Sequence, residues 1–386
     1  MKHLKKQRNW ICTIAFFVLL LTLSTTVFAA KIGNKYSTGA VFPDYQETVT
    51  IQVDPVKFDR TFKEALLEAE EKASSLIQYK IVLPPGTYTA ERVYRLPSNT
   101  HIYARGVTIY AKGTRVGMLV TDATKKSENI IVEGGTWSTV KQNPVSGTML
   151  RFLGVKNMML KDMKIQSNRK NHIIEVADMN GFTVTGCAIS GNNKDNKAPY
   201  KSVQSKEALQ LDVAIPSAMP GFDTAPAMYN GKGCHRVLIK NNTFYNCARG
   251  VGSHSGTGKG IEKYPYTYIT VTGNTIKNLL GEAVYGQNWR YSTISANKIS
   301  NCRQAGIYLL DTYSIRLNKN HITNVKQYTG ARKTTYDPNG EYGVGVLARR
   351  SNLLYMDYNT IQKTARKGIL LEAGCKKVTN KKNQVF

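Results

Sequence analysis

A short phrase of Asn, a variable residue and a large apolar residue recurs through the second half of this 386-residue chain. The steps between successive copies are 32, 23, 23 and 39 residues. A base period near 23 residues, lengthened by insertions, accommodates the three short strands and three turns of one coil of a right-handed parallel β-helix. The copies are Asn242-Thr-Phe244, Asn274-Thr-Ile276, Asn297-Lys-Ile299, Asn320-His-Ile322 and Asn359-Thr-Ile361.

The pattern between these phrases agrees with stacked coils. From Ile81 onward, short β-branched runs are separated by Gly and Asn, and the tight two-residue turns that a β-sandwich requires are not evident. An Asn repeated at one turn can bond its side-chain amide to the next coil, which gives the repeat a physical role. We therefore predict an all-β fold, a single-stranded right-handed parallel β-helix. The helical spacing of Phe58 to Ser75 predicts a short N-terminal helical cap.

The first residues have the pattern of an export signal. Four basic residues precede the apolar run Trp10 to Leu23, and small residues follow near Ala29 and Ala30. We expect residues 1–30 to be a signal peptide cleaved near Ala29/Ala30, which predicts a secreted or cell-surface protein. A retained signal anchor is the alternative. Residues 31–79 are then an N-terminal segment with the capping helix, and residues 80–386 are the β-helix domain.

The chain is strongly basic, with 53 Lys and Arg against 26 Asp and Glu and a formal net charge of +27. An exported protein with this charge is expected to be retained on polyanions such as those of bacterial cell surfaces. The basic residues are spread through the turns and no nucleic-acid-binding module is recognisable, so no nucleic-acid partner is expected. The five cysteines after the signal show no metal-binding spacing and are expected in the core. We expect a monomer.

One strand of each coil can be aligned on the repeat. Side chains of a strand alternate between its two faces, so the outer members of each aligned triplet point into the core and the middle one points out. The residue before each triplet is often small, which predicts a shallow floor outside the sheet. The triplets begin at Leu150, Ile174, Leu209, Val251, Val284, Ile307, Val344 and Ile369. The small residues before them include Ala208, Gly250, Ala283, Gly306, Gly343 and Gly368.

Polar residues collect on the outward side of these strands. Glu175 and Asp212 are one coil and two residues apart, which places their Cβ atoms about 8 Å from each other. Two carboxylates at such a distance suit acid/base cleavage of a glycosidic bond with a water between them. His254 would neighbour Asp212 on the next coil, and Glu207 lies at a strand entrance. The predicted catalytic residues are Glu175, Glu207, Asp212 and His254. The predicted substrate-binding residues are Arg151, His172, Gln210, Arg249, Tyr285, Gln287, Arg290 and Tyr308.

Two sets of motifs resemble known secreted proteins. Leu83-Pro-Pro-Gly-Thr-Tyr88 and Leu96-Pro-Ser-Asn-Thr-His101 are similar to the opening coils of polygalacturonase-like and pectate-lyase-superfamily proteins. Glu207-Ala-Leu-Gln-Leu-Asp212, followed one coil later by Gly250-Val-Gly-Ser-His254, resembles a group of secreted bacterial β-helix proteins. The resemblance implies a carbohydrate-active β-helix. The Asp-Asp pair of polygalacturonases is missing, and Tyr313-Ser-Ile-Arg316 is a poor match to their Arg-Ile-Lys strand.

Three functions remain open from the sequence. The leading hypothesis is a glycoside hydrolase that acts on a polysaccharide. Two of its carboxylates would serve as acid and base, and no cofactor is expected. The alternative is a lyase or epimerase acting on a uronic-acid polymer, with His254, Arg249 or Tyr285 as base and with Ca²⁺ held by the carboxylates if a metal is used. The third is a non-catalytic β-helix that binds a polysaccharide or the cell envelope.

Overall fold

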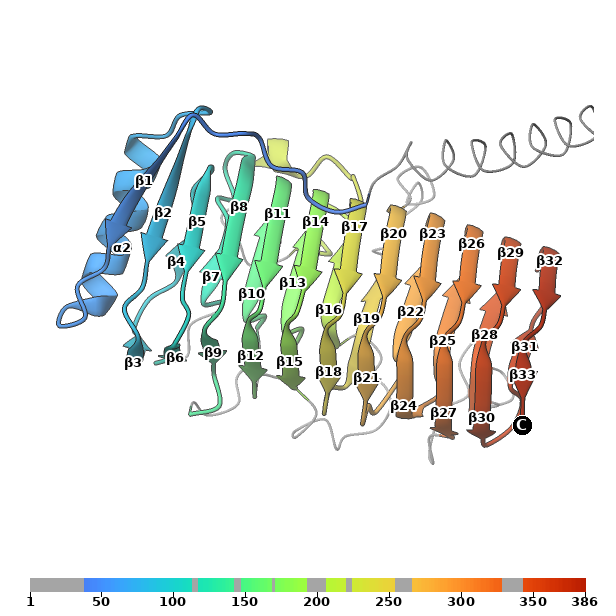
Figure 1. The fold of residues 1–386 in the computed structure, drawn as a ribbon. Coiled ribbons are helices and arrows are strands. Elements are labelled where there is room, and N and C mark those ends of the chain that lie inside the picture. Colours follow the sequence, from blue (N-terminus) through green and yellow to red (C-terminus); the bar gives the residue numbers. More distant parts are fainter. Residues whose placement is uncertain are drawn as a thin grey trace, which may run out of the picture. The chain divides into compact units, whose positions relative to one another are not determined.

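The computed structural model describes residues 38–112, 117–141, 147–168, 171–192, 206–219, 224–253, 266–327 and 343–386. In these ranges the chain winds into three long parallel sheets, and each coil gives one strand to each sheet in turn (Figure 1). The predicted right-handed parallel β-helix is confirmed. No helix of the described residues is long and apolar enough to cross a membrane.

We name the sheets A, B and C in the order in which a coil visits them. Sheet A contains β1 (Glu47–Gln52), β2 (Ile77–Val82), β5 (Thr100–Tyr103), β8 (Ser127–Glu133), β11 (Val155–Lys161), β14 (Asn180–Thr185), β17 (His235–Lys240), β20 (Tyr266–Thr272), β23 (Trp289–Ser295), β26 (Tyr313–Asn318), β29 (Asn352–Asp357) and β32 (Lys376–Lys381). Sheet B contains β3 (Gly86–Ala90), β6 (Val107–Ala111), β9 (Thr136–Ser138), β12 (Lys164–Ser167), β15 (Ala188–Gly191), β18 (Thr243–Tyr245), β21 (Thr275–Lys277), β24 (Lys298–Arg303), β27 (His321–Lys326), β30 (Thr360–Thr364) and β33 (Gln384–Val385). Sheet C contains β4 (Tyr94–Arg95), β7 (Leu119–Val120), β10 (Leu150–Leu153), β13 (Ile174–Ala177), β16 (Glu207–Asp212), β19 (Arg249–Ser253), β22 (Val284–Gln287), β25 (Ala305–Leu310), β28 (Val344–Arg349) and β31 (Ile369–Leu371).

The repeated Asn forms a continuous ladder at the turn from sheet A to sheet B, buried at every position except the last. Each amide Nδ2 donates to the Oδ1 of the Asn one coil further on, over 2.8–3.0 Å from Asn242 to Asn383. The same Oδ1 atoms also accept the backbone N–H of the preceding Asn. The amide ladder predicted from the sequence is therefore present, and it extends one coil beyond the last phrase identified there.

One helix, α2 (Phe58–Glu71), packs at the N-terminal end of the coils (Figure 1). Its buried face contains Phe58 and Phe62, whose rings contact Tyr88 and Tyr94 with centroids 3.9 and 4.3 Å apart. The helical cap expected from the periodicity is thus present. Strand β1 precedes this helix and pairs in parallel with β2, so sheet A already contains a strand before the cap.

The register of sheet C agrees with the alignment made from the sequence, except at β28. Leu150, Ile174 and Leu209 are successive partners, but Ile307 pairs with Val346 and not with Val344. The predicted triplet was therefore displaced by two residues at this coil. The 39 residues from Asn320 to Asn359 are the longest step between two Asn phrases, and counting from the phrase cannot divide the extra residues between the loop and the strand.

The small residues before the triplets do not form an outer floor. Ala208 and Ala283 belong to the central core, and a Cβ on Gly250 or Gly306 would meet Ile276 or Ile322 of sheet B. That part of the prediction is wrong. These residues lie where the chain turns from sheet B into sheet C, and the strict alternation of a flat strand does not hold across such a corner.

Candidate functional site

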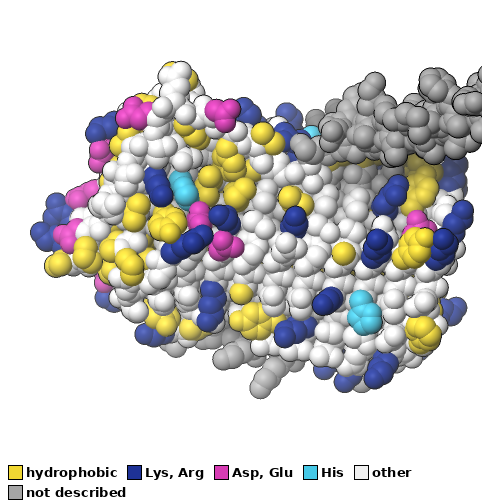
Figure 2. Space-filling model, viewed as in Figure 1, with side chains coloured by type: hydrophobic (Ala, Val, Ile, Leu, Met, Phe, Trp, Pro, Cys, Tyr) yellow, Lys and Arg dark blue, Asp and Glu magenta, His cyan; other side chains and the backbone are white. Residues whose placement is uncertain are grey.

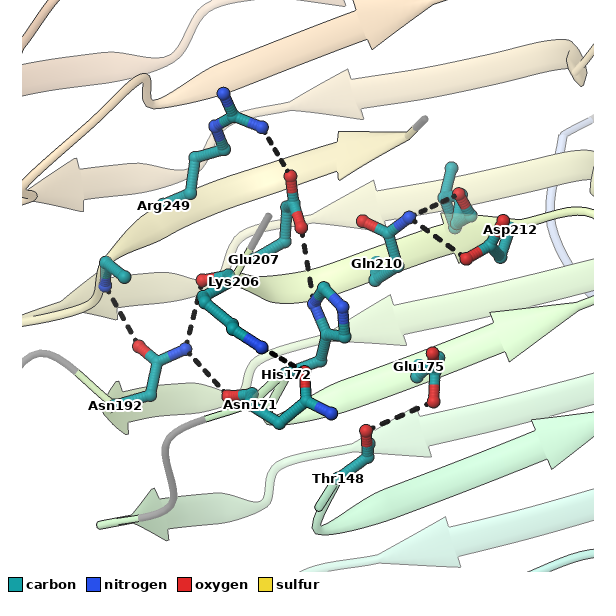
Figure 3. Close-up of polar contacts among 12 residues, drawn as sticks. Thr148, Asn171, His172, Glu175, Asn192, Lys206, Glu207, Gln210, Asp212 and Arg249 are labelled. Carbon is teal, nitrogen blue, oxygen red and sulfur yellow. Dashed lines mark hydrogen bonds and ion pairs between the residues drawn. The ribbon is translucent and has the colours of Figure 1, made fainter. Parts of the chain in front are cut away.

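The outward side chains of sheet C form one column across successive coils. Arg151 is the register partner of Glu175, and Glu175 is the partner of Gln210. From Gln210 the column continues through Gly252 to Tyr285 and Tyr308. Their strand neighbours Leu150, Ile174 and Leu209 belong to the core. The close-up in Figure 3 shows several of these polar side chains standing on neighbouring strands. The column predicted from the repeat is therefore present.

A second group of charged residues begins the strands of sheet C. Arg249 donates from Nη1 to Glu207 Oε1 and from Nε to Glu282 Oε2, both over 2.7 Å. The other oxygen of Glu207 lies 3.2 Å from His172 Nδ1 (Figure 3). The two carboxylates raise the pKa of Arg249 further above its usual range despite the burial, which works in the opposite direction. Gly252 leaves room for this group, since a Cβ there would come within 2.6 Å of Glu207 Cγ.

Glu175 is held by a cation and a hydroxyl. Its Oε2 lies 2.7 Å from Arg151 Nε and accepts a hydrogen bond of 3.1 Å from Thr148 Oγ1. Sequence reasoning missed Thr148. It lies two residues before Leu150, the same offset that separates His172 from Ile174 and Glu207 from Leu209, so extending that column by one coil would have found it.

Asp212 lies in a different environment. It is the register partner of Ala177, two residues beyond Glu175, as the sequence alignment predicted. Its side chain accepts from Gln210 Nε2 at 3.3 Å and from the backbone N–H of Val213 at 2.9 Å, and no cation of the described residues forms an ion pair with it. Burial, followed by the negative charge of Glu175, raises the pKa of Asp212 well above its usual range.

The whole cluster is buried. Glu207 and Gln210 are fully inaccessible, and Asp212, Arg249 and Glu175 are 1–5% exposed. The loop after β16 covers part of this face. Its residues Met219 and Met228 pack against Leu153 and Ala177, and Arg151 Nη2 lies 3.8 Å from Met219 Sδ. The outward side predicted from the sequence is therefore not open to solvent at these residues.

Aromatic residues continue the column beyond the charged groups. Tyr285 and Tyr308 pack with centroids 5.1 Å apart, and the guanidinium of Arg249 lies 4.4 Å from the centroid of Tyr285. The hydroxyl of Tyr285 donates to Gln287 Oε1 over 3.0 Å. Burial is the main reason that the pKa values of both tyrosines are raised.

Two predicted site residues are not placed in this cluster. Arg290, which we predicted to bind substrate, lies on β23 of sheet A outside the sheet C column, and its Nη1 donates to the backbone oxygen of Asp311 over 2.5 Å. The sheet changes between Gln287 and Trp289, which residue counting did not reveal. His254 lies outside the described residues. Within the described ranges, no three His, Cys, Asp or Glu side chains converge as a metal ion would require.

The cysteines of the described residues are free. Cys187, Cys234, Cys247 and Cys302 are buried, and burial raises the pKa of each of these thiols to about 12. Cys375 is partly exposed. The predicted core location is therefore confirmed for four of them.

The chain is similar to known β-helix proteins. Residues 227–386 match the family described as right handed beta helix region, and no curated protein matches the sequence. PfbA, a surface adhesin of Streptococcus pneumoniae, is similar over 88% of this chain and 91% of its own, with a TM-score of 0.64 and 14% identity. A hyperthermoactive exopolygalacturonase from Thermotoga maritima is similar over 90% and 94%, with a TM-score of 0.55 and 13% identity. These likenesses establish the shared fold.

Proposed function

We propose that this chain is a secreted, carbohydrate-active protein that hydrolyses glycosidic bonds of a polysaccharide at the outward face of sheet C. One observation carries the proposal. Glu175 and Asp212 lie on adjacent coils in opposite environments, the first paired with Arg151 and the second without a cationic partner among the described residues. Two carboxyl groups in contrasting environments are what a general acid and its partner require at neutral pH.

The proposed roles follow from these environments. Asp212, with its raised pKa, holds the proton that passes to the oxygen of the leaving sugar. Glu175 accepts a proton from the water that attacks the anomeric carbon. One proton is therefore given by Asp212 and one is taken up by Glu175 in each cleavage. Arg151 and Thr148 hold Glu175 in place. The proposal requires Met219 to move away from Arg151 so that a polysaccharide reaches these groups.

The charges of the cluster weigh against the lyase or epimerase alternative. Arg249 is bound by two carboxylates and its pKa is raised, so it cannot serve as a proton-abstracting base. The pKa of Tyr285 is raised as well. Of the three bases considered for this alternative, only His254 stays available, and it lies outside the described residues.

A polysaccharide-binding protein without catalysis is the second candidate. The nearly complete burial of the charged cluster favours this function, because ion pairs such as Glu207–Arg249–Glu282 satisfy one another and need no ligand. The surface adhesin that is similar in fold to this chain is compatible with it.

Turnover separates these functions. The purified protein is incubated with a panel of neutral and acidic polysaccharides, and both new reducing ends and new ultraviolet absorbance are recorded. We expect reducing ends without the absorbance of an unsaturated product. Asp212→Asn and Glu175→Gln are each expected to lower the rate by at least about a hundredfold. Asp122→Asn, a matched change of another buried aspartate, is expected to leave the rate unchanged.

The opposite results are equally clear. Unsaturated product would establish a lyase. Polysaccharide binding without turnover, unchanged in Asp212→Asn and Glu175→Gln, would establish the non-catalytic function.

A further inference from the structure

Four aromatic rings form a row along the outer side of sheet A, away from the candidate site on sheet C. We call His235, Tyr268, Tyr291 and Tyr313 the ring row, with one ring from each of β17, β20, β23 and β26. Successive centroids are 5.2, 5.6 and 5.7 Å apart, and Tyr268 and Tyr291 are stacked with 21° between their planes. The spacing follows the coil repeat, so the rings run along the axis of the β-helix.

The two central rings are held on unusual backbone. Tyr268 and Tyr291 have φ values of 57° and 51°, in the left-handed region that bulky residues rarely adopt. Other coils also have a positive φ at this register position, where the residues are Asn157, Gly181, Arg236, Ser314 and Leu353. Tyr291 is also 52% exposed. Residues of other kinds share this backbone conformation, so what sets these two coils apart is the stacked pair of tyrosine rings.

A cavity adjoins the first ring of the row. It has a volume of about 590 Å³ at the corner between sheets C and A, and its lining includes Lys126, Lys156, Lys232 and His235. Two carboxylates, Asp178 and Glu128, also line it and form ion pairs with Lys126 and Lys156. Because His235 belongs to both features, the cavity and the ring row form one continuous surface.

Basic residues accompany the rings. Arg236 directly follows His235, and Arg290 is the register partner of Tyr313. Together with the three lysines of the cavity they outnumber the two carboxylates there. On the face drawn in Figure 2, Lys and Arg are otherwise scattered over the surface and do not form one stripe. An anionic partner is therefore favoured electrostatically along this surface.

We propose that the cavity and the ring row together bind one chain of an acidic polysaccharide, at a second site separate from sheet C. The outward sides of these rings pack against the apolar C–H groups of the sugars, and one ring per coil suits a polymer that lies along the β-helix axis. The lysines and arginines contact the carboxylate or sulfate groups of the sugars. This site requires no bond cleavage, so the proposal does not depend on the hydrolase function.

A matched pair of tyrosines tests the proposal. Tyr291→Asn removes a ring from the row, and Asn tolerates the left-handed backbone. Tyr358→Asn is the control, because Tyr358 is 51% exposed with φ 56° but lies on the turn between β29 and β30. Binding of polygalacturonate and of neutral dextran is measured by isothermal titration calorimetry, with Asp212→Asn as background so that cleavage does not interfere. Thermal unfolding checks that each variant folds.

We expect Tyr291→Asn to weaken polygalacturonate binding by about fivefold and Tyr358→Asn to leave it unchanged. Dextran should bind far more weakly than polygalacturonate. Equal losses in both variants, equal binding of dextran, or no binding of polygalacturonate would each overturn the proposal. A concentration-dependent dimer in wild type that Tyr291→Asn dissociates would also overturn it and would assign the row to a second copy of the chain.

Discussion

Single residues of this fold take their chemistry from their place in the stack, and Asp212 is the clearest case. An Asp at the end of a β-strand is ordinarily solvated and charged. Here the strand end is covered, and the charge of Glu175 is close, so the protonated form is favoured. Asp122, another buried aspartate, shows the opposite effect. Burial acts to raise the pKa of Asp122, but hydrogen bonds from Thr124 and the charge of Arg95 outweigh it and lower that pKa.

The two aspartates predict opposite pH dependences of stability. Because the folded pKa of Asp212 lies above that of an unfolded Asp, its stabilising contribution is complete below about pH 4 and is lost as the pH rises through the folded pKa. Replacing it by Asn should remove that loss. In urea unfolding from pH 4 to 9, the advantage of Asp212→Asn over wild type is therefore expected to grow with pH.

Asp122→Asn is the control for this series. Because the pKa of Asp122 is lower in the folded protein than in the unfolded chain, this residue stabilises the fold at any pH above its unfolded pKa. That contribution disappears as the pH falls through the folded pKa. The variant should therefore lose stability at neutral pH and approach wild type in acid. A difference between Asp212→Asn and wild type that stays constant across the range would contradict the proposed protonation of Asp212.

At the scale of elements, the turn from sheet A to sheet B depends on side-chain amides. Asn297 accepts from the backbone N–H and the amide of Asn274, and it donates to the backbone oxygen of Val271 and to Asn320 Oδ1. An amide can satisfy this number of groups because it carries two donors and two acceptor lone pairs. The ladder therefore pairs backbone groups that the turn leaves without strand partners.

Asn297→Ala tests the ladder. The substitution removes side-chain hydrogen bonds to buried polar groups of two neighbouring coils, so we expect the free energy of unfolding to fall by about 2–4 kcal/mol. Asn383→Ala, at the last and partly exposed position of the ladder, is expected to cost less than half of that. Chemical unfolding, followed by circular dichroism, compares the stability of the two variants. Equal losses of unfolding free energy would mean that the interior position of the ladder has no special role.

At the scale of the whole molecule, each coil contacts mainly its two neighbours, and the exposed end of such a stack needs a cover. At the N-terminal end this cover is α2, which buries Phe62 completely against the first coils. Because stability propagates from coil to coil in a solenoid, loosening the cap destabilises more than the helix itself.

Phe62→Ala should show this coupling. The lost ring leaves a cavity beside Tyr94, and we expect the free energy of unfolding to fall by about 3–5 kcal/mol. Hydrogen exchange should accelerate in β2 and β3 before the central coils. Phe62→Leu, which retains most of the volume, is the control. Unchanged exchange at the N-terminal coils of Phe62→Ala would contradict the role of α2 as a cap.

Much of this organisation could be predicted from particular residues. The Asn phrases predicted both the coil and the ladder, and the alignment placed Glu175 and Asp212 on adjacent strands. Prediction failed where insertions or corners interrupt the period. Val346 takes the place expected for Val344, and Gly250 faces the core. At a corner the chain changes direction, and the two-residue alternation no longer decides which way a side chain points.

The sequence by itself determined the winding of the chain and the outward column, because both follow from a period that recurs locally in every coil. Only the tertiary structure decided which of these residues meet solvent. The charged cluster is covered by a loop that the repeat does not describe, and the ring row is visible only when strands from separate coils are stacked. Burial and ring stacking depend on how loops and neighbouring coils lie in space. A periodic pattern along the chain does not specify these positions.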